Sequence, residues 1–169
     1  IVMIVIWNGA RLIKPIMFLP SLFIHSTSAG LFGLYYSTLF VRRHFSGPML
    51  AFLGLAAGTS LGLAVTVFNE IILGGLGDRR SGDEYAVGGG SFTEPLIWLI
   101  LLFLQLTSGS KYIYRNIFVI SILAWYQLMN PFIPASYRIW AAILPIIAIS
   151  VMDLSPYKRQ IFLYCYTTY

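Results

Sequence analysis

The chain has 169 residues, of which 58% are hydrophobic and only 10% are charged, and its mean hydropathy is +0.79. A soluble domain has roughly a quarter charged residues, so this composition excludes an ordinary water-soluble protein and predicts an integral membrane protein. The net charge of +5 comes from basic residues in short clusters between apolar runs, a pattern that flanks membrane spans and argues against a nucleic-acid partner.

Long apolar runs divide the chain into predicted membrane helices, because a span takes about 20 apolar residues. Complete spans are predicted at 16–41, 48–73, 96–109, 117–132 and 138–152. The runs at 1–7 and 161–169 are predicted partial spans. The runs are continuous rather than alternating, and backbone amides in lipid must pair within the segment. The predicted fold class is therefore all-α: a polytopic transmembrane helix bundle with about five complete spans and partial spans at both ends.

The predicted organisation is one transmembrane domain over residues 1–169. The chain opens and closes inside apolar runs, so we expect it to be a piece of a longer polytopic protein. The one long connection, residues 74–95, carries seven glycines and the acids Asp78, Asp83, Glu84 and Glu94. We expect this glycine-rich loop outside the cytoplasm and the "RRHFSG" loop, residues 42–47, inside, which also puts the basic residues near 111–115 and 158–159 inside.

Signatures of a cofactor or metal site are missing from the sequence. Cys165 is the only cysteine, so neither a disulfide nor a cysteine metal site can form within the chain. There is no phosphate-binding Gly-Lys-Ser/Thr loop, no HExxH motif and no pair of histidines at metal spacing. We expect no cofactor and no metal.

His25 stands in the apolar stretch "FIHSTSAG". On a helix, Ser21, His25 and Ser28 share one face, because they are spaced at i, i+4 and i+7. A polar stripe inside a span faces protein or water rather than lipid. Two interpretations follow. His25 either packs through a hydrogen bond to Ser21 or a neighbouring helix, or it is a catalytic or substrate-contacting group on the floor of an outward cavity.

Glu70 and Arg138 are two further charges at the edges of apolar runs. Glu70 either ends its helix at the membrane surface or points a carboxylate into the same outward cavity. Arg138 opens the run "SYRIWAAILP", at the helix end where the dipole disfavours a cation. It is either an interfacial anchor or the partner of an acid or a bound phosphate.

Three stretches together resemble the EpsG/Wzy-type polysaccharide polymerases: "FLPSLFIHSTSAG", "RRSGDEYAVGGGSFTEPLIWLI" and "NPFIPASYRIWAAILP". The resemblance implies polymerisation of oligosaccharide repeat units carried on undecaprenyl pyrophosphate, by a multi-pass protein at the outer face of the bacterial inner membrane. It implies a glycosyltransferase-type reaction without metal or nucleotide, and a chain-length regulator protein and membrane lipid as further partners.

The resemblance also suggests roles for individual residues. His25 or Glu70 would take the proton of the acceptor hydroxyl. Arg138, Arg79 and Arg80 would bind the substrate through its pyrophosphate, together with Ser28. Two alternatives stay open: a transporter or flippase component for a lipid-linked glycan, which should show inverted repeats, and a membrane subunit without chemistry.

Overall fold

The computed structural model describes residues 26–67, 93–129 and 136–168 of the chain. These residues form six α-helices, and the figures keep their labels: α3 (Ser26–His44), α4 (Gly47–Val67), α6 (Thr93–Leu106), α7 (Ser110–Met129), α8 (Ser136–Val151) and α9 (Pro156–Thr168). The predicted all-α class is confirmed for the described part of the chain. Most of the 74–95 loop and the partial span at 1–7 lie outside the described residues.

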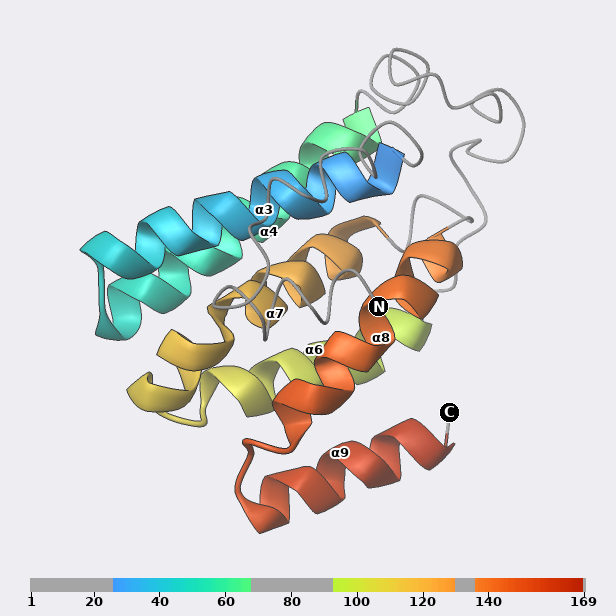
Figure 1. The fold of residues 1–169 in the computed structure, drawn as a ribbon. Coiled ribbons are helices and arrows are strands. Elements are labelled where there is room, and N and C mark those ends of the chain that lie inside the picture. Colours follow the sequence, from blue (N-terminus) through green and yellow to red (C-terminus); the bar gives the residue numbers. More distant parts are fainter. Residues whose placement is uncertain (1–25, 68–92, 130–135, 169) are drawn as a thin grey trace.

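The helices alternate in direction along the chain (Figure 1). One end of the bundle, on the left in Figure 1, holds the last turns of α3, α6 and α8 and the first turns of α4, α7 and α9. We call it the basic end, because the basic residues of α3, α7 and α9 lie in or next to these turns. The other end, on the right, holds the first turns of α3, α6 and α8 and the last turns of α4 and α7. Short turns therefore join the helices at the basic end.

Two of these turns depend on glycine. Gly47, the first residue of α4, has φ of +58°, and Gly109, between α6 and α7, has φ of +89°. Side chains with a Cβ atom rarely adopt positive φ, so glycine is the residue that permits both reversals. The third turn ends with Pro156 at the first position of α9, where a missing N–H leaves no helical hydrogen bond unmade.

Helix α7 lies at the centre of the bundle and contacts α3, α4, α6 and α8. Most of its side chains are buried, among them Ile120, Leu123 and Trp125, each no more than 2% exposed. Apolar residues of the surrounding helices close this core, for example Leu50 of α4 and Leu101 of α6, both fully buried. A helix that is apolar on nearly every side packs stably only when other helices surround it.

Helix α4 packs closely against α7 through three glycines spaced four residues apart: Gly54, Gly58 and Gly62. A Cβ atom on Gly58 would overlap the backbone carbonyl of Ser121, and one on Gly54 would overlap the side chain of Ile117. Small residues at this spacing let two helix backbones approach closely. The glycine row of α4 therefore fixes the distance between these two helices.

The prediction of about five complete spans is wrong. Among the described residues, one helix, α4, is long and apolar enough to cross a membrane. It corresponds to the predicted span 48–73, whose last six residues lie outside the description. Helix α6 has 14 residues and is about 21 Å long at about 1.5 Å per residue, well short of a hydrocarbon core of about 30 Å.

The other predicted spans belong to helices that are short or include charged residues, which the apolar runs alone did not indicate. The predicted span 117–132 belongs to α7, which begins at Ser110 and so includes Lys111 and Arg115. The predicted span 138–152 falls almost entirely within α8, which has only 16 residues and contains Pro145. The described part of the span 16–41 is α3, which ends in Arg42, Arg43 and His44. The described part of the partial span at 161–169 forms the last eight residues of the 13-residue α9, which begins at Pro156.

Helix α4 is not enclosed by the rest of the described bundle. Phe52 is 65% exposed, and Leu63 and Val67 are similarly exposed on the same helix. Water disfavours so large an apolar surface. The exposed face of α4 therefore suits contact with lipid.

Candidate functional site

Most residues singled out from the sequence lie beyond what the structure describes. His25, Glu70, Arg79 and Arg80 are outside the described residues. Ser28 belongs to the first turn of α3 and Arg138 to the first turn of α8. The description covers the backbone of these two residues and not their side chains.

The helices next to these residues in sequence meet at one end of the bundle. Helix α3 begins one residue after His25, α4 ends three residues before Glu70, and α8 carries Arg138 in its first turn. These three helix termini lie at the end opposite the basic end (Figure 1). Helix α6, which follows the segment with Arg79 and Arg80, also begins there.

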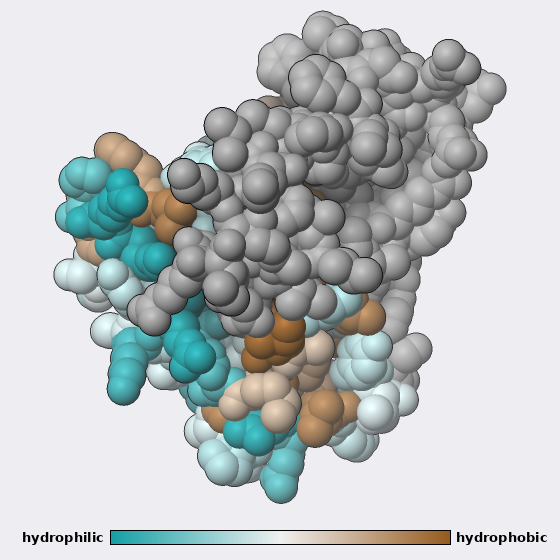
Figure 2. Space-filling view, viewed as in Figure 1, coloured by the Kyte–Doolittle hydropathy of each residue, from teal (hydrophilic) through white to brown (hydrophobic). Residues whose placement is uncertain are grey.

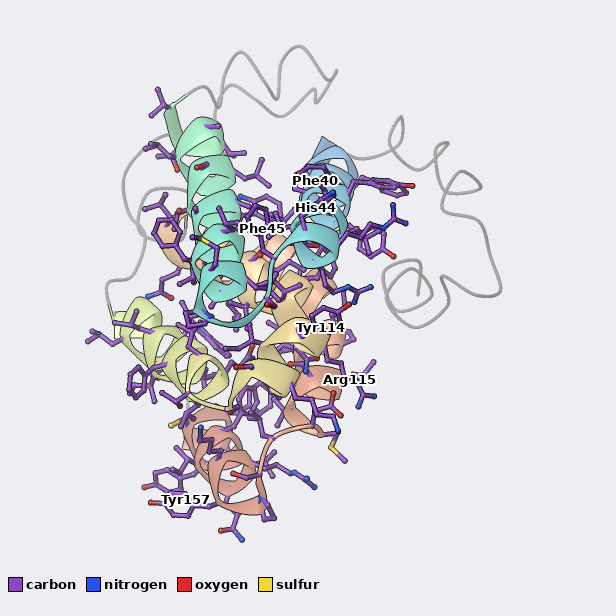
Figure 3. All side chains as sticks on the ribbon, turned by 90° about the vertical axis from the view of Figure 1, so that its left-hand side faces the viewer. Phe40, His44, Phe45, Tyr114, Arg115 and Tyr157 are labelled. Atoms are coloured by element: carbon purple, nitrogen blue, oxygen red, sulfur yellow. The ribbon has the colours of Figure 1, made fainter. Side chains whose placement is uncertain are left out.

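The basic end gathers positive charge from three helix termini. The last turn of α3, the first two turns of α7 and the first turn of α9 contribute the cations Arg42, Arg43, Lys111, Arg115, Lys158 and Arg159. Figure 3 looks onto this end and shows His44, Tyr114, Arg115 and Tyr157 around it. Figure 2 shows hydrophilic side chains gathered at the same end, with hydrophobic ones beside them.

A cavity of about 270 Å³ opens at the basic end between α3, α7 and the end of α8. We call it the basic pocket. Its polar lining comes from three segments far apart in sequence and consists of Tyr35, Thr38, Arg42, Arg115 and Asp153. The exposed side chain of Met152 also lines it. A drug-sized ligand takes about 300–1,000 Å³, so this volume suits a small polar group rather than an oligosaccharide.

Arg115 forms an ion pair across the basic pocket. Its Nε lies 3.2 Å from Oδ2 of Asp153. The same carboxylate oxygen accepts a hydrogen bond of 3.3 Å from Nδ2 of Asn116. The Arg115 side chain is 72% exposed, and exposed pairs stabilise a protein by at most about 1 kcal/mol. The contact therefore matters more for where it holds the guanidinium than for the stability of the fold.

The helix bends where this pair is anchored. Asn116 has φ of −111° and ψ of 18°, outside the helical range, and it is fully buried. One turn earlier, the hydroxyl of Tyr112 donates a hydrogen bond of 3.2 Å to the carbonyl oxygen of Ser150 on α8. Burial raises the pKa of the Tyr112 phenol well above its usual value. Buried polar contacts thus tie α7 to α8 beside the basic pocket.

Arg42 borders the basic pocket from the α3 side. Its guanidinium carbon lies 5.4 Å from the centre of the Tyr114 ring, a cation–π distance. Below it, the buried Thr38 hydroxyl donates a hydrogen bond of 2.8 Å to the carbonyl oxygen of Tyr35. Burial raises the pKa of the Tyr35 phenol, and the nearby charge of Arg42 partly offsets this rise. Within the described residues, the Arg42 guanidinium has a ring beneath it and no hydrogen-bond acceptor.

The basic residues of α9 are engaged differently. Lys158 donates hydrogen bonds to Leu104 O, Thr107 Oγ1 and Ser108 Oγ, at the last turn of α6. Arg159 donates to the carbonyl oxygens of Met152 and Leu154. Cations at these positions satisfy carbonyl groups left open at helix C-termini. Lys158 and Arg159 therefore connect helices, whereas Arg42 and Arg115 face a cavity.

Sequence reasoning missed the basic pocket. It treated Arg42 and Arg115 as flanking charges, and the contact between Arg115 and Asp153 joins residues 38 positions apart. The available signal was Asp153, a lone acid at the end of an apolar run, together with Asn116 next to Arg115. In the part of the chain that the structure describes, no group of three or more His, Cys, Asp or Glu side chains could hold a metal.

In comparisons with known proteins, no protein-family model, curated protein or solved structure matches the chain.

Proposed function

We propose that this chain takes part in polymerising oligosaccharide repeat units carried on undecaprenyl pyrophosphate, at the outer face of the bacterial inner membrane. The observation that carries the proposal is the common location of four helix termini. The termini of α3, α4, α6 and α8 that adjoin the segments with His25, Glu70, Arg79, Arg80 and Arg138 lie at one end of the bundle. The resemblance to EpsG/Wzy-type polymerases in the same three stretches supports it.

The chemistry requires one acceptor, one donor and one base. The hydroxyl of the acceptor sugar attacks the anomeric carbon of the donor glycan, and the bond from that carbon to the pyrophosphate oxygen breaks. The hydroxyl proton passes to a base, for which His25 and Glu70 are the candidates. Undecaprenyl pyrophosphate leaves with the bonding electrons.

Negative charge grows on the leaving pyrophosphate during this step. Positioned arginines stabilise such charge, because guanidinium N–H groups match phosphate oxygens in pairs. Arg138, with Arg79 and Arg80, would supply this contact, and Ser28 would contact the substrate. A chain-length regulator protein and membrane lipid are the further proposed partners. The exposed apolar face of α4 supports a place in the membrane.

The test is His25→Ala in the full-length protein, expressed in cells that make the polymer. We expect normal abundance and single repeat units on the lipid carrier at the outer face, without longer chains. A hydrogen bond used only for packing inside a membrane contributes about 0.6 kcal/mol on average, so a packing histidine would leave elongation intact.

Two other outcomes would contradict the proposal. Long polymer from His25→Ala would make His25 a packing residue. Accumulation of lipid-linked units at the inner face would indicate a flippase instead.

A further inference from the structure

We propose that the basic pocket binds a phosphate group, held between Arg42 and Arg115, and that an anionic phospholipid is the carrier of this group. The proposal concerns the end of the bundle opposite the one assigned to polymerisation, and it does not depend on that assignment. It rests on the charge, donor geometry and surroundings of the pocket.

The charges that line the basic pocket favour an anion. Two guanidinium groups border it, and Asp153 is the single carboxylate in its lining. Asp153 is paired with Arg115, so one positive charge remains without a counter-charge. No acid besides Asp153 reaches this cavity among the described residues. A concave site with a net charge raises the local concentration of ions of the opposite sign.

The donor atoms are held in place with unused hydrogen-bonding capacity. Arg115 uses Nε for Asp153, and no contact within the described part of the chain occupies its two terminal nitrogens. Arg42 is fixed by its face against Tyr114, which leaves the edges of the guanidinium for an acceptor. The planar arginine fork fits two oxygens of a phosphate, and the arginine charge is present at every physiological pH.

The hydrogen bond from Asn116 fixes the Asp153 carboxylate, and Asp153 in turn orients Arg115. Because a bound phosphate would meet guanidinium groups that are already positioned, little ordering remains to be done on binding. Arg115 and Arg42 come from α7 and α3, so a phosphate between them would also join these two helices.

The surroundings of the basic pocket suit a lipid headgroup. Met152 lines the pocket and is 64% exposed, and Phe40 and Phe45 are exposed at the same end (Figure 3). Exposed apolar side chains at the same end as two arginines match a molecule with a phosphate attached to acyl chains. Clusters of basic residues on the cytoplasmic side of a membrane helix bind anionic headgroups. The 42–47 loop leads directly into α4, and the cytoplasm is where we expect this loop.

The test measures lipid binding by the purified full-length chain in a neutral detergent. The probes are phosphatidylglycerol, phosphatidylcholine and soluble glycerol phosphate, and bound lipid is counted by native mass spectrometry across a titration. We expect phosphatidylglycerol to bind and phosphatidylcholine to bind at least about tenfold more weakly, because the trimethylammonium group of phosphatidylcholine would be repelled by the two guanidinium groups beside the phosphate. Tight binding of glycerol phosphate would mean that the pocket binds phosphate but that its ligand is a soluble molecule and not a lipid.

Three variants separate the basic pocket from general surface charge. Arg42→Gln should weaken phosphatidylglycerol binding by about tenfold or more. Arg43→Gln removes the same charge from the next residue, which does not line the pocket, and should change binding by less than about twofold. Arg42→Lys keeps the positive charge but loses the two parallel N–H donors of the guanidinium. Its loss of binding should lie between the losses caused by Arg42→Gln and Arg43→Gln.

Equal losses from Arg42→Gln and Arg43→Gln would overturn the proposal, because the effect would then be one of net charge. Equal binding of phosphatidylcholine and phosphatidylglycerol would overturn it as well. The helical signal in circular dichroism identifies a variant that fails to fold, and Arg115→Gln then provides the same comparison with Arg43→Gln from the other side of the pocket.

Discussion

The hydroxyl of Ser121 on α7 donates a hydrogen bond of 2.8 Å to the carbonyl oxygen of Gly54 on α4. The bond crosses the close contact between α4 and α7, where glycines of α4 face the α7 backbone. It is possible only because no Cβ atom separates the two helices. The packing of the candidate membrane helix therefore depends on a few small residues.

Gly58→Ala should destabilise the protein. The new methyl group would overlap the Ser121 carbonyl, which is backbone and cannot move aside cheaply. We expect a loss of about 1–3 kcal/mol, the usual range for overpacking, measured as the free energy of unfolding in a mixed detergent. Gly33→Ala is the control, because nothing lies within 4 Å of its added Cβ. It should stabilise α3 by up to about 1 kcal/mol through helix propensity. Equal effects of the two substitutions would contradict the described packing.

Gln105→Met should stabilise the protein. Gln105 is fully buried, and neither Nε2 nor Oε1 has a hydrogen-bond partner within the described structure. Leaving a buried polar group unpaired costs about 1–3 kcal/mol, and methionine has nearly the same shape without that need. The expected result is a higher midpoint of thermal unfolding. A lower midpoint would mean that Gln105 has a partner that this packing does not provide.

Tyr112→Phe should change how stability depends on alkaline pH. The folded protein keeps this phenol neutral, since burial raises its pKa above the ordinary value of 10.0. Because the folded-state pKa is the higher one, the stabilisation is complete below pH 10 and is lost as the pH rises further. The loss has a limiting slope of about 1.4 kcal/mol per pH unit.

Below pH 10, Tyr112→Phe should lose about 1 kcal/mol with its hydrogen bond to Ser150. Above pH 10 the wild type should approach the stability of the variant and then fall below it. The measurement is urea unfolding of both proteins between pH 8 and 11 in detergent, an interval chosen to bracket a usual tyrosine pKa of about 10. Parallel curves over the whole range would contradict a buried, hydrogen-bonded phenol.

Cysteine labelling tests whether α4 separates two compartments. In a Cys165→Ser background, Ser81→Cys in the 74–95 loop should react with a membrane-impermeant maleimide in intact cells. Ser46→Cys, in the exposed turn before α4, should react only after the membrane is opened. The reason is that α4 lies between the two positions and is long and apolar enough to cross the bilayer. Labelling of both sites in intact cells would mean that α4 does not cross.

The sequence predicted some features of the fold well and others poorly. Helical structure followed from the continuous apolar runs, and the start of α4 was placed within one residue, because Gly47 and Pro48 end the preceding charged turn. The number of spans was overestimated, because the prediction followed apolar runs and not whole helices. The apolar run after Asn116 belongs to a helix that also contains Lys111 and Arg115. The basic pocket could not be predicted, since Arg42, Arg115 and Asp153 meet only through the packing of α3, α7 and α8.

The proposed polymerase role is tested most directly by Arg138→Lys in the full-length protein, with the ladder of glycan lengths as the readout at equal protein level. Lysine keeps the charge and the long stem of a membrane anchor but cannot offer two parallel N–H donors to a pyrophosphate. Arg43→Lys is the matched control, because Arg43 is exposed at the basic end, away from the first turn of α8. We expect Arg138→Lys to give mostly single repeat units on the lipid carrier and Arg43→Lys to give the wild-type ladder. A wild-type ladder from Arg138→Lys would contradict the account.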